Sequence, residues 1–473
     1  MKPLPNETTR NLNPRIKLLG LLLLFSISAS CILHSQSIVQ SSAMDLLWSH
    51  DHDGNWYDNN NDDNESVEIG GGLRGILQRE REGAFAEPNN NTIKNMNYVT
   101  SNWTSTWINS IPSSHHASPY ILYVHVGKTG GTTLEEGIPI PTGKVITTLL
   151  CTVQLTAAKL PLHNARQFCF HHIDQNQPTA QLARHILAHK HLQYPQLPNL
   201  LDFAMEHLDT ILITTRNPID RIVSSFNFQR NTLVHNYTKR ANSSEEKERI
   251  QSSLYKFSGV GVKESFYNCF PDVRYMAEEL AHFFHLNDTH SRSITLPTTS
   301  SNTSIVYNNM TCGQLANDLL SPRQYGGLSH YTSNYRWYKQ LTIDKRPEVP
   351  ILIVRTEYLW QDATNIEVAL GGNASNFLKS HHTMSYGSES YAVKAKLETD
   401  LQRKAVCCAI YDDLQAYQDI ILSALNLDEH EKMEMMGLVY RDCSVDQDAY
   451  EGDILYGIQF WEKWVASNCN GRG

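Results

Sequence analysis

Several signatures of common functional classes are missing from this chain. After residue 33 no stretch is long and apolar enough to span a membrane, and no internal repeat is present. No basic run forms a nucleic-acid-binding patch, and the net charge is −9. The cysteines show no C-x-x-C spacing, so a metal site is not expected. A Walker A motif, G-x-x-x-x-G-K-[ST], is also absent, which disfavours an ATP kinase.

The one apolar run long enough to consider for a membrane lies at the N-terminus. Leu18–Leu33 follows a short segment with four basic residues and precedes acidic sequence. This charge asymmetry predicts a type II signal anchor with residues 1–17 in the cytosol and the rest of the chain in a lumen. The small residues Ser28, Ala29 and Ser30 leave a cleaved signal peptide as the alternative.

Residues 34–117 have the composition of a stem. The segment from Asp51 to Glu68 is rich in Asp, Asn and Gly and poor in apolar side chains, so it cannot bury a core and is expected to be disordered. Glycosylation sequons begin at Asn64 and Asn90, and others follow in the body, as suits a luminal glycoprotein. We expect one large α/β domain over residues 118–465.

The most informative stretch is YILYVHVGKTGGTTL, Tyr120–Leu134. The apolar run Ile121–Val126 predicts a buried strand. It leads into a loop of glycines, hydroxyls and one lysine: Gly127, Lys128, Thr129, Gly130, Gly131, Thr132 and Thr133. Glycines let the backbone approach an anion, and N–H groups of a helix beginning near Thr132 would point at it. The loop therefore indicates a phosphate or sulfate site.

A second anion motif follows another predicted strand. Thr210–Thr215 is β-branched and apolar, and Arg216-Asn217-Pro218 comes directly after it. Asn and Pro suit the start of a helix, and Ser224 lies about two turns along that helix. An arginine at the carboxyl end of a strand stands where open α/β sheets bind ligands. Arg221, by contrast, is expected to be a solvated residue or part of an ion pair.

Together the two segments resemble the donor-binding motifs of Golgi carbohydrate sulfotransferases, such as the heparan sulfate 2-O- and 6-O-type enzymes. The resemblance implies a P-loop-like sulfotransferase fold and the donor 3′-phosphoadenosine 5′-phosphosulfate (PAPS). It assigns the loop Gly127–Thr133 to the 5′-phosphosulfate, and Arg216 and Ser224 to the 3′-phosphate. A guanidinium fork and a hydroxyl both suit a phosphate. The resemblance also implies a Golgi-resident, single-pass membrane enzyme.

The remaining pattern favours a mainly parallel sheet with helices on both faces. Val349–Val354 is a third buried-type strand, and the segments between the strands have helical or loop character. The spacing of Leu182, Ile186, Leu187 and His189 predicts a helix, as does Met276–Phe284. Asn287–Asn309 is expected to be a loop insertion. Ile351–Asp362 resembles a late strand with the E-x-L-x-x-D segment of the same family.

The luminal part contains eight of the nine cysteines, an even number in an oxidising compartment. Eight cysteines allow 105 connectivities. Cys269 and Cys312 flank the Asn-rich insertion, and we predict that this pair forms a disulfide.

Sulfuryl transfer needs a base for the acceptor hydroxyl and positive charge at the leaving oxygen. Lys128 is the predicted source of that charge. The family carries a histidine base between its donor motifs, where His171 and His172 are candidates here, although their setting departs from the family's pattern. Glu135 and Glu136 are rivals that equally suit a helix N-terminus. The aromatic segment Tyr325–Tyr338 either lines a sugar or adenine site or packs as a helix.

The sequence thus predicts a PAPS-dependent sulfotransferase that modifies a hydroxyl of a glycan in the Golgi lumen. Its partners would be a glycan acceptor and, through the anchor, the membrane, with no nucleic acid and no metal. The alternatives are a catalytically inactive glycan-binding protein with the same fold and a protein tyrosine sulfotransferase. The sequence specifies neither the acceptor sugar nor the oligomeric state.

Overall fold

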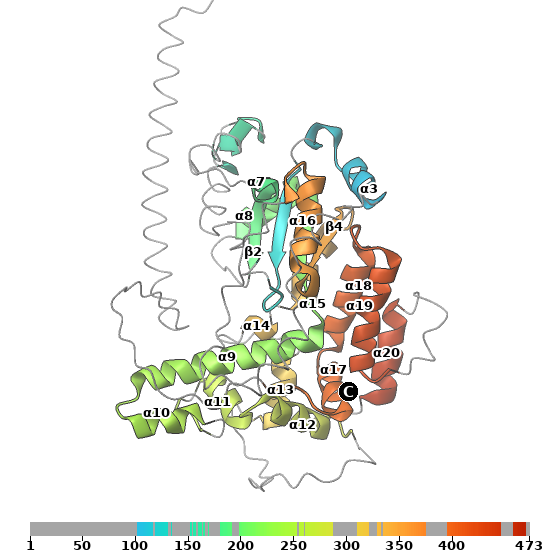
Figure 1. Ribbon diagram of the computed structural model, residues 1–473. Helices are drawn as coiled ribbons and strands as arrows, with labels where there is room; N and C mark the ends of the chain where they lie inside the picture. The colour runs from blue at the N-terminus through green and yellow to red at the C-terminus, as the bar shows by residue number, and fades with distance from the viewer. Residues whose placement is uncertain are drawn as a thin grey trace, which may run out of the picture. The chain divides into compact units, whose positions relative to one another are not determined.

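Four parallel strands form one sheet in the order β2-β1-β3-β4 (Figure 1). They are β1 (Ile121–His125), β2 (Ile186–His191), β3 (Thr210–Thr215) and β4 (Ile351–Arg355). This computed structural model describes residues 102–116, 119–130, 134, 152–153, 155–157, 159–162, 164–165, 169, 180–191, 198–252, 255–259, 261–286, 310–320, 329–332, 334–374, 395–445 and 457–469. The three predicted strands are confirmed as β1, β3 and β4.

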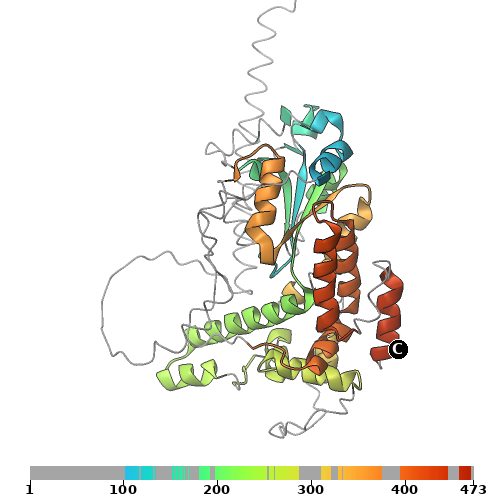
Figure 2. The ribbon, with the colours of Figure 1, turned by 45° about the vertical axis from the view of Figure 1, so that its right-hand side comes forward.

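Each face of the sheet is covered by a different set of helices. Side chains alternate along a strand, so Leu122 and Val124 belong to one core cluster and Ile121 and Tyr123 to another. The smaller cluster includes side chains of α7 (Gln181–His185) and α16 (Leu359–Ala369), and Figure 2 shows α16 running alongside the sheet. The protein therefore has a mixed α/β architecture, with helices on both faces of the sheet.

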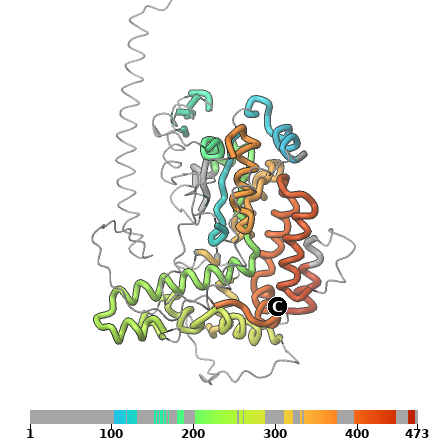
Figure 3. Tube along the Cα trace, in the orientation of Figure 1, coloured from blue at the N-terminus to red at the C-terminus, as the bar shows by residue number. Residues whose placement is uncertain are grey.

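The larger cluster lies under most of the other helices. Their bounds are α8 (Pro198–His207), α9 (Pro218–Arg240), α10 (Ser244–Gln251), α11 (Val262–Cys269), α12 (Val273–Phe283), α13 (Cys312–Leu320), α14 (Ser329–Thr332), α15 (Tyr335–Leu341), α17 (Asp400–Ala409), α18 (Tyr411–Ser423), α19 (Glu429–Asp442) and α20 (Gly457–Asn468). In the tube of Figure 3 the C-terminal helices α17, α18 and α19 meet the long helix α9, which they contact. The predicted helix Met276–Phe284 is confirmed as α12.

The predicted helix through Leu182, Ile186, Leu187 and His189 is only partly right. The chain is helical from Gln181 to His185 and then forms strand β2 from Ile186. Strand β2 pairs in parallel with β1, with Leu122 opposite Ala188. A short apolar run fits either a helix or a strand, and here pairing with the neighbouring strand decides.

The folded part begins before the predicted boundary at residue 118. Helix α3 (Asn102–Ser110) lies in the segment assigned to the stem, yet its Trp107 side chain is fully buried against the sheet. The indole nitrogen of Trp107 donates to the hydroxyl of Thr210 on β3 at 2.9 Å. Burial of an aromatic side chain with a satisfied N–H makes this helix part of the domain.

The predicted disulfide Cys269–Cys312 is confirmed. Two more bonds join neighbouring residues of α17 to the C-terminal region: Cys407–Cys443 and Cys408–Cys469. Cys169 is also disulfide-bonded. Disulfides of this number are typical of proteins that fold in an oxidising compartment.

Two predictions fall on residues that the structure does not describe, the anchor Leu18–Leu33 and the insertion Asn287–Asn309. In the part of the chain that is described, no helix has the length and apolar character needed to cross a membrane.

Candidate active site

The two anion motifs come together because their strands are neighbours. Strands β1 and β3 pair in parallel, with Val124 opposite Ile213, so their carboxyl ends lie at the same edge of the sheet. The hydroxyl of Thr129 donates to the carbonyl of Val126 at 2.5 Å and lies 2.6 Å from the hydroxyl of Thr214. This buried contact ties the loop after β1 to β3.

The loop after β1 closes a tight turn with a strained residue in it. The N–H of Thr129 donates to the carbonyl of Val126 at 3.3 Å, and Lys128 has a φ of 68°. A positive φ at the third residue of a turn usually calls for Gly or Asn, and for a lysine it costs about 1–3 kcal/mol. Such strain concentrates at functional sites. Gly130 also has a positive φ, 74°.

Lys128 and Arg216 meet at this edge. The guanidinium Nη1 of Arg216 lies 3.5 Å from the carbonyl oxygen of Lys128. Burial of the Lys128 ammonium, together with the charge of Arg216, lowers the pKa of Lys128 from its usual 10.5 to about 8. Within the described residues neither side chain has an ion pair. The two positive charges thus interact at this edge, and a bound anion would offset their repulsion.

Helix α9 places aromatic and hydroxyl groups next to this pair. The Lys128 Nζ atom lies 3.6 Å from the centroid of the Phe228 ring, a cation–π contact. Ser224, half-buried, is four residues before Phe228 on the same helix face. The third predicted donor residue therefore lies on the helix face that Lys128 contacts.

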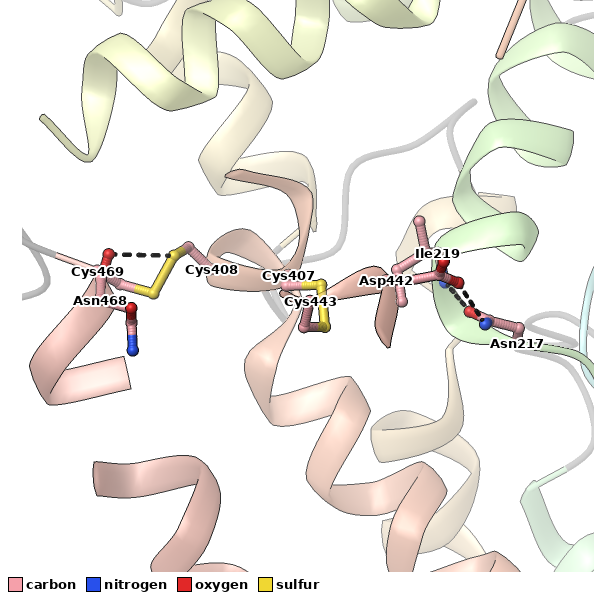
Figure 4. Close-up of a disulfide and its surroundings, with 8 residues drawn as sticks. All are labelled: Asn217, Ile219, Cys407, Cys408, Asp442, Cys443, Asn468 and Cys469. Atoms are coloured by element: carbon pink, nitrogen blue, oxygen red, sulfur yellow. Dashed lines mark hydrogen bonds between the residues drawn. A yellow bond between two sulfur atoms is a disulfide. The ribbon is translucent and has the colours of Figure 1, made fainter. Parts of the chain in front are cut away.

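The backbone around Arg216 is fixed from three directions. The buried hydroxyl of Tyr335 accepts from the N–H of Arg216 and donates to its carbonyl, both at 2.7 Å. The side chain of Asn217 caps α9 by accepting from the N–H of Ile219. The Asn217 amide donates to Asp442 at 2.8 Å, beside the Cys407–Cys443 disulfide, as Figure 4 shows.

Arg221 forms an ion pair, one of the two roles expected for it, but it is fully buried rather than solvated. Its Nη2 donates to Asp413 of α18 at 3.1 Å, and its Nη1 donates to the carbonyl of His330 at 2.8 Å. This arginine therefore joins α9, α14 and α18 behind the site.

His330 is the residue at this site that the sequence analysis did not single out. A Cβ atom on Gly127 would come 2.8 Å from the His330 Cδ2 atom, so the absence of a side chain at Gly127 lets the imidazole approach the loop. The imidazole also packs edge-on to Phe228. Its location within the segment Tyr325–Tyr338 was the only sequence signal. Tyr331, Tyr335 and Tyr338 of that segment are core residues, as a packed helix requires.

The loop after β4 completes this edge of the sheet. The hydroxyl of Thr356 donates to the carbonyl of Thr215 at 2.8 Å. In the E-x-L-x-x-D segment, Asp362 accepts two hydrogen bonds from the guanidinium of Arg355, a buried bidentate pair. Asp362 thus has a structural role, holding the end of β4 to α16.

Five predicted site residues lie outside the described residues: Gly131, Thr132, Thr133, His171 and His172. Of the other six, the structure brings together Gly127, Lys128, Thr129, Gly130 and Arg216, and Ser224 lies one helical turn before Phe228 on α9. The part of the chain that is described contains no cluster of three or more His, Cys, Asp or Glu side chains that could hold a metal ion.

Comparison of the chain with protein-family models, with curated proteins and with solved structures gave no match. The functional reading therefore depends on the motifs and on the geometry described above.

Proposed function

We propose that this protein is a sulfotransferase that moves the sulfuryl group from PAPS to a hydroxyl of a glycan. The observation that carries the proposal is the meeting of Lys128 and Arg216 on loops after two adjacent parallel strands. The two cations suit a ligand with two separate anionic groups, and PAPS carries a 5′-phosphosulfate and a 3′-phosphate. The donor motifs that the sequence resembles require this juxtaposition.

The chemistry of the donor set fits PAPS. In the proposed mechanism Lys128 stabilises the negative charge that builds up on the oxygen leaving sulfur. The glycine-rich backbone holds the 5′-phosphosulfate, Thr129 fixes the turn of that loop through its bonds to Val126 and Thr214, and Arg216 and Ser224 hold the 3′-phosphate. Phe228 supports the Lys128 ammonium from one side, which fixes its direction. The sulfotransferase fold with a P-loop-like donor loop is part of this proposal.

The compartment is inferred from the cysteines and from the N-terminal sequence. Three disulfides within the described residues favour an oxidising compartment. The basic residues before Leu18–Leu33 favour a type II anchor. We therefore propose a Golgi membrane protein whose catalytic domain is luminal.

Calorimetric titration of the full chain with 3′-phosphoadenosine 5′-phosphate (PAP) tests the donor site, with ATP as the comparison ligand. We expect PAP to bind at least about tenfold more tightly than ATP, and Arg216→Ala to lose at least about tenfold of the PAP affinity, the value of a hydrogen bond to a charged group. Arg249→Ala, an exposed arginine on α10, is the matched control and should bind PAP like the wild type.

The outcomes separate the alternatives. Equal affinity for PAP and ATP, or unchanged PAP affinity in Arg216→Ala, would contradict the donor assignment. If PAP binds as expected but no sulfate is transferred to any glycan, the inactive glycan-binding protein becomes the better interpretation. If tyrosine peptides accept sulfate and glycans do not, a protein tyrosine sulfotransferase becomes the better interpretation.

A further inference from the structure

The side chain of His330 shares its surroundings with the lysine of the donor loop. The Phe228 ring contacts both groups, since the Lys128 Nζ atom lies 3.6 Å from its centroid and the imidazole centroid lies 5.5 Å from it. Gly127, the residue before Lys128, has no side chain to separate the imidazole from the loop. His330 therefore lies within a few atoms of the place assigned to the phosphosulfate.

The position of His330 is fixed by hydrogen bonds to its main chain. Its carbonyl accepts from Arg221 at 2.8 Å and lies 3.5 Å from the hydroxyl of Ser225. Arg221 is itself held by Asp413. These contacts use the main-chain carbonyl and would remain if the imidazole were replaced. The fold therefore does not require a histidine at this position.

The imidazole is neutral. Burial of the ring, and then the nearby cations Lys128, His125, Arg221 and Lys263, lower the pKa of His330 to about 3. No carboxylate is among the groups that shift it. A pKa this low leaves the ring neutral but makes it a weak base on its own, and a bound polyanion would offset the positive charges and raise its basicity.

The neighbouring amide of Gln229 bears on which ring nitrogen carries the proton. The Gln229 Nε2 atom lies 3.2 Å from the imidazole Nδ1, whereas the Gln229 Oε1 atom is buried with no hydrogen-bond partner. The two ends of an amide are interchangeable in such an assignment. Turning the amide by 180° satisfies Oε1 with the Nδ1–H group, and the lone pair is then on Nε2.

We propose that His330 is the general base of the sulfuryl transfer, and this inference rests on the proposed function. His330 takes the proton of the acceptor hydroxyl as that oxygen bonds to sulfur. The bond between sulfur and the bridging oxygen breaks at the same time, and its electron pair stays on that oxygen, next to Lys128. The products are the sulfate ester, PAP and a proton held on His330. Gln229 acts as a positioning residue that selects the tautomer.

The test compares His330→Asn with the wild type in the full chain. Transfer of labelled sulfate from PAPS is measured to chemically desulfated heparin and to desulfated chondroitin, and to water if neither accepts. We expect kcat to fall about 10²- to 10⁴-fold, the usual contribution of a general base. PAP affinity, measured by calorimetry, should stay within about threefold because a base makes little contact with PAP. His282→Asn, an exposed histidine on α12, is the control and should leave both quantities unchanged.

Two further measurements distinguish a base from a structural residue. Added imidazole should restore part of the activity of His330→Ala, and Gln229→Leu should shift the pH dependence of kcat. A wild-type rate in His330→Asn would overturn the proposal while the function stood. Loss of PAP affinity with kcat unchanged would reassign His330 to positioning the loop. If the wild type neither binds PAP nor transfers sulfate, the proposed function itself fails.

Discussion

The hydroxyl of Tyr335 holds both main-chain polar groups of Arg216, accepting from its N–H and donating to its carbonyl at 2.7 Å each. The two residues are 119 positions apart, so a single side chain of α15 fixes the backbone at the end of β3. The direction of the arginine side chain depends on this clamp.

Tyr335→Phe should therefore weaken both stability and donor binding. Removing the hydroxyl leaves two part-buried backbone groups of Arg216 without this partner, which costs about 1–3 kcal/mol. Urea unfolding measures this loss, and calorimetry should show weaker PAP binding. Tyr275→Phe on α12 is the control. An unchanged PAP affinity in Tyr335→Phe would mean that Arg216 keeps its direction without the clamp.

Gly127→Ala should impair the site because of where the new methyl group lies. A methyl group added elsewhere should not have this effect. The new Cβ would lie 2.8 Å from the imidazole of His330, so the ring or the loop must move. We expect a fall in transfer rate, measured with labelled PAPS. Gly437→Ala is the matched control, because a Cβ there meets nothing within 4 Å and alanine favours helix α19 by about 0.5–1 kcal/mol. Equal rates in the two variants would argue against a close contact between Gly127 and His330.

Lys128→Gly separates the strain of the loop from its charge. Glycine tolerates the positive φ and removes a buried ammonium, so stability should not fall by more than the lost packing on Phe228. Transfer should be lost. Lys159 has nearly the same φ, 67°, outside the candidate site, and Lys159→Gly should gain about 1 kcal/mol with full activity. Thermal unfolding and the transfer assay, run on both variants, check these expectations.

The pH dependence of PAP binding should follow the charge of Lys128. Its pKa in the folded protein is about 8, so the ammonium is lost as the pH rises through 8 and PAP affinity should fall, by at most about tenfold per pH unit. Calorimetry between pH 7 and about 9.5 measures this, and Lys128→Arg should show a flatter profile. A flat wild-type profile would show that the bound anion does not depend on this charge.

The stability of the folded protein should also depend on Lys128, but its contribution should rise with pH where PAP affinity falls. The folded protein releases the Lys128 proton near pH 8, whereas the unfolded chain holds it up to about 10.5. The unfolded state therefore binds more protons in this window, and the contribution of Lys128 to the free energy of unfolding rises with pH. The difference between wild type and Lys128→Met isolates this contribution.

The two neighbouring disulfides of α17 provide a matched pair of variants. Breaking Cys407–Cys443 should cost about 2–4 kcal/mol and also weaken PAP binding, because Asp442 next to it holds the cap of α9. Breaking Cys408–Cys469 opens a longer loop, 61 residues against 36, and should cost at least as much stability. PAP affinity should stay unchanged there. Double Cys→Ser variants of each bond test this. Their free energies of unfolding and their PAP affinities are compared by urea unfolding and by calorimetry.

What the sequence predicted well was local. Strands β1, β3 and β4 have long apolar runs with turn residues after them, and Lys128 and Arg216 stand at strand ends where parallel sheets bind ligands. Apart from the disulfide Cys269–Cys312, the long-range side-chain contacts were not predicted. His330 reaches the loop through a fold that joins it to Gln229, 101 residues away, and the aromatic segment around it gave no indication of that contact.

The errors have the same origin. Ile186–His191 is a strand because β1 offers it a partner, and its spacing alone fits a helix. For Arg221 the expected ion pair was right, but its burial was not foreseen, because its partner Asp413 is 192 residues away in the sequence. The stem boundary was placed too late because contacts formed in the fold, such as that of Trp107 with Thr210, show that α3 belongs to the domain.

The hydrogen bond between Asn217 and Asp442 also links the N-terminus of α9 to a disulfide. Asp442 is next to Cys443, so the residue that accepts from the Asn217 amide stands beside one that the Cys407–Cys443 bond holds to α17. Under the proposed function, a chain in which these two thiols stay reduced would contain every residue of the proposed donor site, and we expect its cap of α9 to be held less firmly. The redox state of a bond outside the site would then bear on how well Arg216 is aligned.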